Sequence, residues 1–367
     1  MLEVADILRA TGPELCARLA VLPSQKRALQ AIQQCRTAAL GGQVYGCTDC
    51  GQLQYSYHSC GNRHCPKCHG QRTERWLQQQ RGRLLPCPYF LLTFTLPSEL
   101  RALARSHQKL LYGFLLHAAA ASLQKLCADP RWLGAQPALL GVLHTWTRAM
   151  LYHPHAHFLV SAGGLSADGQ RWVPAKHPNF LVPVRALSAI FRAKLRDRLK
   201  RARLLPHVPA KVWKQKWVVH AQHAGSGQKV LDYLGRYVFR IAISNSRLET
   251  LEQGQVTFRY RDNRTQQLKR VRLPVQEFVQ RFLQHVLPLG LTKVRHYGLS
   301  SSACRQRHAA AMALLQTASP PTPPEPPSPP ANRPSSQPPQ PIARCPHCGN
   351  GRLVWLGQIL PSRKIPP

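Results

Sequence analysis

Acidic residues are scarce in this chain, and the scarcity limits its possible partners. Among 367 residues there are 15 Asp and Glu against 50 Lys and Arg, which gives a formal net charge of +35 and an isoelectric point near 10.7. A field of that sign favours a polyanion, and we expect nucleic acid ahead of a membrane surface. The length corresponds to roughly two or three domains.

A long apolar run is also missing. The most apolar stretch, 110–121, is interrupted by His117 and falls short of the ~18 residues expected of a membrane-spanning helix. The first residues, Met1-Leu2-Glu3-Val4, have neither the basic start nor the apolar core of a signal peptide. We therefore expect a cytoplasmic protein with no membrane partner.

The segment 35–69 has few apolar residues from which to build a core, and it is rich in Cys, His and Gly instead. Twelve cysteines in a cytoplasmic chain, several in Cys-x-x-Cys pairs, indicate zinc rather than disulfides. Two such pairs, Cys47 with Cys50 and Cys65 with Cys68, have the spacing of one four-thiolate Zn²⁺ site. Such a site is structural, because four protein ligands leave no open position for chemistry.

Other residues of the same segment predict a second, interleaved zinc site. Its expected ligands are Cys35, Cys60 and His64, with His58 and His69 as further candidates. Basic side chains around the cysteines, among them Arg63, Lys67, Arg72 and Arg75, are expected to bind DNA.

Half of another zinc site follows near the C-terminal end, at Cys345 and Cys348. Cys304 and His308, at helical spacing, are candidates to complete it. Proline dominates the intervening residues 317–344, which predicts an extended, solvated linker. The pairing stays a hypothesis, because nothing relates the length of such a linker to the geometry of a metal site.

Two histidines that flank one apolar residue stand inside an apolar run. Side chains alternate along a strand, so His155 and His157 point to the same side of a strand expected over 155–161. A divalent cation held there would act as a Lewis acid on a phosphate. The candidates for a third ligand, in order of preference, are His144 on a strand expected over 139–146, and then His220, His223 and Gln228.

Two tyrosines lie four residues apart in a helix expected over 228–240. Tyr233 and Tyr237 therefore share one face, on which Arg236 and Arg240 could hold phosphates and lower the phenol pKa. Tyrosine suits the cutting of DNA, because a phosphotyrosine bond allows strand transfer as well as hydrolysis. Each pattern alone is more typical of packing, but together in so basic a chain they favour catalysis.

Other regular elements are predicted from periodicity and turn residues. The expected strands are 89–95 and 211–219, with a hairpin that pairs 256–261 with 267–273 and another turn at Asp168-Gly169, and a helical region is expected over 98–126.

At these residues the chain closely resembles the two-tyrosine HUH transposases of bacterial rolling-circle insertion sequences. The matching segments are 35–42, 59–68, 94–97, 153–157, 233–237 and Arg295-His296-Tyr297-Gly298. They occur in order through roughly residues 1 to 300, which makes the resemblance more specific than any single motif.

The resemblance implies an α+β fold: an HUH, Rep-like nuclease domain with an antiparallel sheet flanked by helices, preceded by a small helical zinc-binding domain. The corresponding boundaries are 1–85, 86–300, a helix end and linker over 301–344, and a tail over 345–367. His155 and His157 would hold Mg²⁺ or Mn²⁺. Tyr233 and Tyr237 would form 5′-phosphotyrosine links with single-stranded DNA. The protein would be associated with the nucleoid, and a homo-oligomer is a candidate for its assembly.

Two departures and two alternatives accompany the resemblance. Gln43 stands where the family often has a histidine, and the proline-rich tail is not matched to any part of the family. A plasmid replication initiator would use the same chemistry, whereas relaxases usually place their tyrosine before the histidine pair. A non-catalytic zinc DNA-binding remnant of a transposase is the alternative from another class.

Overall fold

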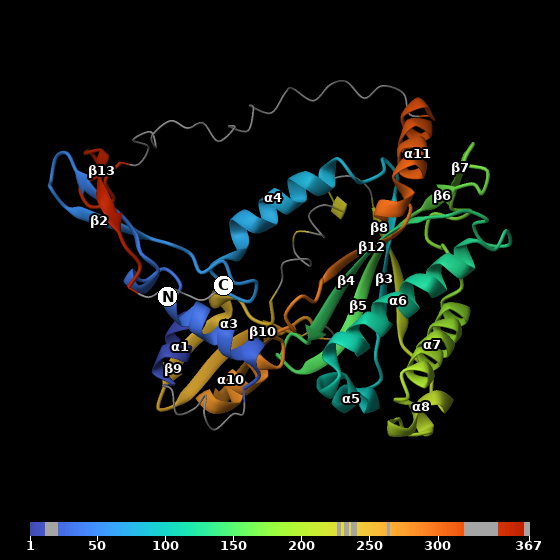
Figure 1. Cartoon of the computed structure of the whole chain (residues 1–367), viewed down its shortest axis with the longest axis horizontal. Coiled ribbons are helices and arrows are strands. Elements are labelled where there is room, and N and C mark those ends of the chain that lie inside the picture. The colour runs from blue at the N-terminus through green and yellow to red at the C-terminus, as the bar shows by residue number, and fades with distance from the viewer. Residues whose placement is uncertain are drawn as a thin grey trace. The chain divides into compact units, whose positions relative to one another are not determined.

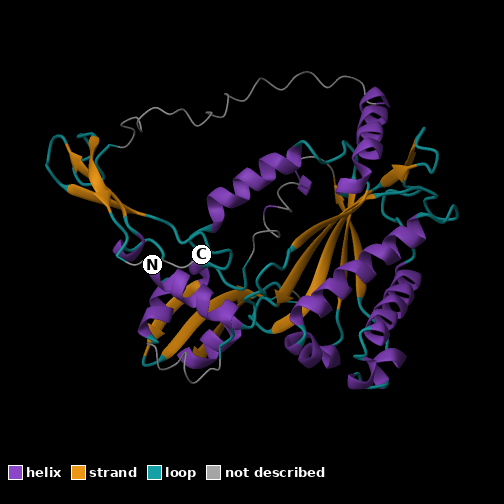
Figure 2. Ribbon diagram, viewed as in Figure 1, coloured by secondary structure: helices purple, strands orange, loops and turns teal. Residues whose placement is uncertain are grey.

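The computed structural model describes residues 1–11, 21–225, 229–230, 235, 241–262, 265–318 and 344–362, with the backbone alone at 69–73 (Figure 1). The chain forms two compact units, 1–69 together with 322–367, and 70–321. Both contain helices and antiparallel strands (Figure 2), which confirms the predicted α+β class.

A five-stranded antiparallel sheet organises the larger unit, in the order β12-β4-β5-β3-β8. Its strands are β3 (Tyr89–Thr95), β4 (Ala138–Trp146), β5 (Tyr152–Ser161), β8 (Val219–Gly225) and β12 (Val294–Gly298). Three of them match expected strands. The strand predicted over 211–219 is wrong, because the short helix α8 (Lys211–Lys214) occupies its first half and β8 begins only at Val219.

One face of this sheet packs against helices. These are α5 (Arg101–Ser106), α6 (Gln108–Cys127) and α7 (Val184–Arg201). Phe94 of β3 makes edge-to-face contacts with Phe158 of β5 and Phe191 of α7, at centroid distances of 5.6 and 5.1 Å. Helix α6 is long and apolar enough to cross a membrane by length and composition alone. Most of its residues are buried in this core, as in the core helix of a folded domain, so its composition is only weak evidence for a membrane span.

A second apolar core covers part of the opposite face of the sheet. There Leu140 and Leu159 pack with Leu315 of α11 (Arg305–Ala318) and with Leu77 of α4 (His69–Arg81). The hairpin of β6 (Gly163–Leu165) and β7 (Trp172–Pro174) lies beside α11 and includes the predicted turn at Asp168-Gly169, where Gly169 has φ +78°.

Three further strands and a helix belong to the larger unit. The hairpin of β10 (Gln255–Arg261) and β11 (Leu268–Pro274) has the predicted pairing, and β9 (Leu248–Glu252) joins its edge. Helix α10 (Val275–Leu283) follows directly, with Phe278 against Phe258 of β10.

In its described residues the smaller unit combines two α-helices with a three-stranded sheet. Helices α1 (Val4–Ala10) and α3 (Pro23–Gln34) pack through small and aliphatic side chains. The sheet has the order β13-β1-β2, with β1 at Gly42–Cys47, β2 at Leu53–Tyr57 and β13 at Leu353–Ile359. One single-turn 3-10 helix of this unit is at Ala38–Leu40, and those of the larger unit are at Ser98–Leu100, Leu205–His207, Asn245–Arg247 and Ser302–Cys304.

The C-terminal tail is thus not the separate segment that the sequence suggested. Strand β13 pairs along the whole of β1, from Gly42 opposite Ile359 to Cys47 opposite Leu353. The backbone groups of an otherwise unpaired edge of β1 are satisfied in this way. The unit also ends at His69 rather than at residue 85, because α4 packs with the core of the larger unit.

Candidate metal centres

Three histidine rings converge on one face of the large sheet. On β5, Tyr152, Pro154 and Ala156 are buried on one side, while His155 and His157 point to the other. The pairing of β4 with β5 places His144 directly opposite His155. One nitrogen from each of the three rings lies within 4.8 Å of those of the others. The preferred third ligand and the predicted pair therefore form one cluster.

Hydrogen bonds orient two of these rings. His155 Nδ1 lies 2.7 Å from the backbone oxygen of His153, to which its N–H donates, so Nε2 keeps a free lone pair. His157 Nδ1 lies 3.0 Å from Thr93 Oγ1 on the neighbouring strand β3. Contacts of this kind set the tautomer and the direction of a metal-binding histidine.

Both rings are neutral near pH 7. Burial lowers the pKa of His155 to about 4, and burial together with the neighbouring His155 and Lys293 lowers the pKa of His157 to about 3. Neutral imidazole is the form that binds a metal ion, so neither ring has to lose a proton first.

The rings open into a cavity of about 320 Å³. It is lined by Thr93, Thr95, His144, Trp146, Thr147, Arg148, His153, His155, His157 and Arg247. Among the described residues no carboxylate lines it, and two guanidinium groups do. The cavity therefore suits an anion, and a phosphate would meet both cationic side chains and any cation held by the rings.

Backbone carbonyl groups hold the two arginines of the cavity in place. Arg247 Nε donates to the oxygen of Arg259 at 2.8 Å, and Arg247 Nη2 donates to the oxygen of Arg148. Arg148 Nη1 in turn donates to the oxygen of Arg261 at 2.9 Å. Neither arginine was singled out from the sequence, because what places them here is long-range contact between strands and turns.

The remaining candidates for a third ligand lie elsewhere. Thr93 of β3 is opposite His157 on one side and His220 of β8 on the other. His220 therefore lies on the same face of the sheet as the cluster, but β3 separates it from β5. His223 is opposite Phe90 and its ring contacts that side chain edge-on at 5.8 Å, on the other face. Gln228 is outside the described residues.

The predicted nucleophiles Tyr233 and Tyr237, with Arg236 and Arg240, lie outside the described residues. Two neighbours of Tyr233 are described. Val230 is fully buried in the core on the histidine-bearing face, and a Cβ built on Gly235 would be 2.9 Å from Leu77 Cδ1 of α4 in the same core.

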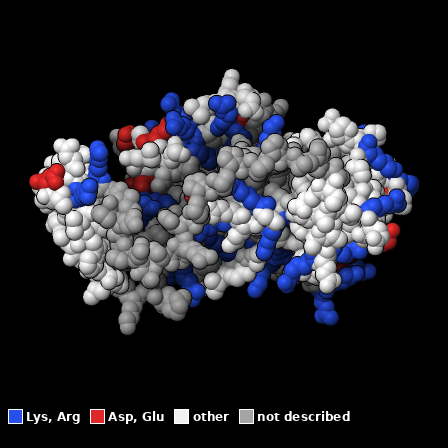
Figure 3. Space-filling view, turned by 90° about the horizontal axis from the view of Figure 1, so that it is seen from above, with Lys and Arg blue, Asp and Glu red and all other residues white. Residues whose placement is uncertain are grey.

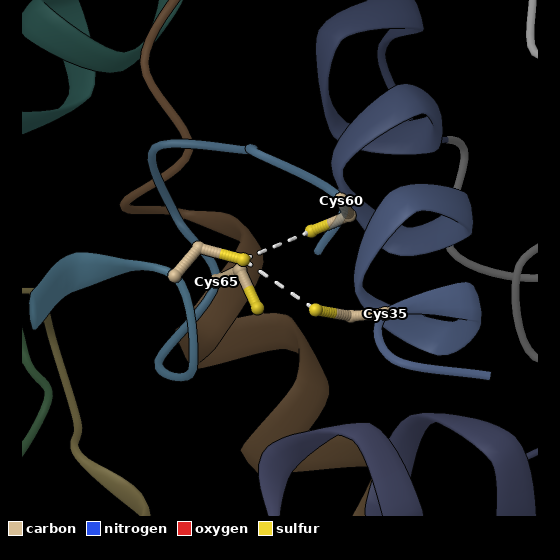
Figure 4. A group of neighbouring side chains, drawn as sticks. Cys35, Cys60 and Cys65 are labelled. Carbon is tan, nitrogen blue, oxygen red and sulfur yellow. Dashed lines mark hydrogen bonds between the residues drawn. The ribbon is translucent and has the colours of Figure 1, made fainter. Parts of the chain in front are cut away.

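The cysteines of the smaller unit form two clusters. In the first, the sulfur atoms of Cys35, Cys60, Cys65 and Cys68 lie within 4.8 Å of one another, and Figure 4 shows three of them pointing together. Cys35 comes from the end of α3 and the others from the segment between β2 and α4. Cys68 Sγ lies 3.4 Å from Cys35 Sγ and 3.6 Å from Cys60 Sγ.

The second cluster joins Cys47 and Cys50 to Cys345 and Cys348, again within 4.8 Å. The predicted single site of Cys47, Cys50, Cys65 and Cys68 is corrected accordingly. Close spacing makes two cysteines neighbours, but it does not determine which distant pair they meet.

Other cysteine and histidine predictions are also corrected. His64 is not in the first cluster, and its Nε2 lies 3.3 Å from Arg63 Nε. Cys345 and Cys348 form their cluster with Cys47 and Cys50 rather than with the candidates Cys304 and His308. Within the larger unit, Cys304 Sγ lies 3.7 Å from Gln136 Nε2, and His308 Nε2 lies 3.0 Å from the oxygen of Arg83. Lys67 forms an ion pair with Glu3, and its binding to DNA stays a prediction.

Comparison with known families agrees with these centres. Residues 139–307, which contain the three histidines, match the family described as "Putative transposase". Residues 7–96, which contain the first cysteine cluster, match the family described as "Transposase zinc-binding domain". No solved structure matches the chain.

Two relatives match over most of their length. The chain is 38% identical to "Putative transposase y4qJ" of Sinorhizobium fredii, over 96% of this chain and 94% of the relative. It is 30% identical to "Transposase for insertion sequence element IS801" of Pseudomonas savastanoi pv. phaseolicola, over 89% of this chain and 82% of the relative.

Proposed function

This chain belongs to the family of transposases that includes the transposase of IS801, and we propose that it cuts and rejoins single-stranded DNA at the ends of an insertion sequence. The observation that carries the proposal is the histidine cluster. Three imidazole rings, of which His155 and His157 are neutral, face a cavity with two guanidinium groups and, among described residues, no carboxylate. In this proposal the cutting and rejoining take place on bacterial DNA in the nucleoid.

The three rings fit a divalent cation. His144, His155 and His157 offer three nitrogen atoms within mutual reach, and the two hydrogen-bonded rings are held in fixed orientations. A bound cation would withdraw charge from the scissile phosphate as a Lewis acid. Arg148 and Arg247 would bind the non-bridging oxygens of the same phosphate or of a neighbouring one.

Tyr233 and Tyr237 are proposed as the nucleophiles. A phenol oxygen attacks the phosphorus, the bond to the 3′ oxygen breaks, and the phenol proton is lost as the 3′ oxygen becomes a hydroxyl. The DNA is left with its 5′ end on tyrosine. Attack by a free 3′ hydroxyl reverses the reaction and joins strands, which is the chemistry of rolling-circle transposition. Val230 and Gly235 support the assignment, since both pack on the histidine-bearing side.

The test is cleavage of labelled single-stranded oligonucleotides that together cover the DNA flanking the gene. With Mn²⁺ the protein is expected to cut one of them and to stay attached to the new 5′ end, on the fragment that lies 3′ of the cut, which is seen as a slow band on a denaturing gel. His155→Ala and the double change Tyr233→Phe, Tyr237→Phe are expected to abolish both products.

A matched control is available on the same sheet face. His220→Ala removes a histidine of β8, which is separated from β5 by β3, and is expected to leave cleavage unchanged. Cleavage that survives His155→Ala or the double tyrosine change would rule the proposal out. DNA binding without any cleavage would indicate a non-catalytic DNA-binding remnant.

A further inference from the structure

We propose that two segments far apart in the sequence form a second zinc site, in which Cys47 and Cys50 share one Zn²⁺ with Cys345 and Cys348. The second pair of cysteines lies outside both family matches, which cover 7–96 and 139–307. The site is independent of the proposed cleavage reaction.

The two halves of the site have the same local structure. Each reads Cys-x-x-Cys-Gly, and the glycines Gly51 and Gly349 have φ +68° and +74°. In each half the glycine N–H donates to the oxygen of the first cysteine, at 3.1 Å for Cys47 and 2.8 Å for Cys345. A left-handed glycine reverses the chain without strain, so that both sulfur atoms of a pair point the same way.

The sulfur atoms have the spacing of a metal site. Cys47 Sγ lies 3.6 Å from Cys348 Sγ, and Cys50 Sγ lies 3.7 Å from Cys345 Sγ. Four sulfur atoms on a tetrahedron at the usual Zn–S distance would be about 3.8 Å apart. The Gly351 N–H also points at Cys348 Sγ, at 3.4 Å, as expected of a group that stabilises a thiolate.

Contacts between the two halves show that they fit each other. The N–H of Thr48 donates to the oxygen of Arg352 at 3.0 Å, and the N–H of Arg352 donates to Thr48 Oγ1 at 3.0 Å. A Cβ built on Gly351 would be only 2.3 Å from Cys47 Sγ. Only glycine therefore lets this turn approach the sulfur of the other half.

Apolar burial does not account for the attachment of β13. Val354, Trp355 and Leu356 are 47%, 53% and 58% exposed, and Tyr55 of β2 is 47% exposed. A small sheet without a buried apolar face is marginal in water. A shared zinc ion supplies the missing stabilisation, because its binding free energy is gained only when both halves are folded together.

Metal content tests the proposal on the full chain. Purified protein is expected to carry two Zn²⁺ by native mass spectrometry, one for each cysteine cluster. The double change Cys345→Ser, Cys348→Ser and the double change Cys47→Ser, Cys50→Ser should each leave one. All four changes together should also leave one, because the pairs share a single ion. Cys304→Ser, outside both clusters, should leave two.

Two glycines of the same C-terminal segment supply a test that keeps every cysteine. Gly351→Val is expected to remove one Zn²⁺, since the side chain would occupy the space of Cys47 Sγ. Gly357→Val is the control, because a Cβ there meets nothing within 4 Å. Two ions retained by the Cys345→Ser, Cys348→Ser variant would overturn the proposal. So would disulfide bonds between the two pairs in the purified protein.

Discussion

At the scale of single residues, the histidine cluster depends on a hydroxyl group that the sequence did not point to. Thr93 on β3 is opposite His157 on β5, and its Oγ1 lies 3.0 Å from His157 Nδ1. A ring held in this way presents its other nitrogen to a metal ion.

Loss of that hydroxyl is expected to weaken metal binding. Thr93→Val keeps the shape of the side chain but removes the hydrogen bond to His157 Nδ1, and we expect the Kd for Mn²⁺ to rise by roughly tenfold or more. Isothermal titration of the full chain measures it. Thr95→Val is the control, since Thr95 lines the same cavity but is opposite His155 instead. Equal loss in both variants would contradict a specific role for Thr93.

The ligand set also predicts which metal works best. Imidazole nitrogen suits Mn²⁺ better than Mg²⁺, which prefers oxygen ligands, and no carboxylate lines the cavity among the described residues. We expect half-maximal cleavage at a concentration of Mn²⁺ at least about tenfold below that of Mg²⁺. A titration of each metal against initial rate gives the answer. Equal requirements would indicate that a carboxylate from another part of the chain completes the site.

At the scale of elements, one buried histidine ties the end of β4 to α10. His285 is 4% exposed; its Nε2 lies 3.1 Å from the oxygen of Met150, and its Nδ1 lies 3.2 Å from Thr145 Oγ1. The turn that it anchors carries Arg148 into the cavity. Burial lowers the pKa of His285 to about 4.

This pKa predicts a loss of stability in mild acid. The unfolded chain binds a proton at His285 near pH 6.5 and the folded chain only near pH 4, so the stabilisation is complete above pH 6.5 and is lost as the pH falls towards 4. The maximum effect is about 3 kcal/mol. Urea unfolding at pH 7 and pH 4.5 should show a smaller acid-induced loss in His285→Gln than in the wild type. An identical loss in both would contradict the assignment.

At the scale of the whole molecule, excess positive charge is the dominant property. In Figure 3 Lys and Arg greatly outnumber Asp and Glu on the face shown. A second cavity of about 840 Å³ in the larger unit is lined by four cationic side chains, Arg83, Lys109, Arg295 and Arg305. It lies beside β12, whose Arg295-His296-Tyr297 segment is one of those that carry the family resemblance.

Salt dependence tests whether this cavity binds DNA. Affinity for single-stranded DNA should fall steeply with salt, with a slope of about 0.7 per phosphate contact on a log–log plot. The double change Arg295→Ala, Arg305→Ala is expected to reduce that slope by about 1.4. Arg131→Ala is the control, because Arg131 is already paired with Asp129. An unchanged slope in the double variant would place the bound strand elsewhere.

Local patterns in the sequence were sufficient for several features. Alternation along β5 put His155 and His157 on one face, the hairpin of β10 and β11 has the predicted pairing, and cysteine spacing indicated zinc. Each of these depends on residues close together in the chain, whose mutual geometry is set by backbone periodicity and turn chemistry.

Partners distant in the chain were decided only by the tertiary structure. The register of β4 against β5 placed His144 beside the predicted histidine pair, and the pairing of β13 with β1 brought Cys345 and Cys348 to Cys47 and Cys50. A Cys-x-x-Cys pair has the same local geometry whichever second pair it meets. The sequence pattern of a strand likewise does not show whether the strand lies at the centre or at the edge of a sheet. Which segments meet depends on the packing of the whole chain, and that information is not contained in any local window of residues.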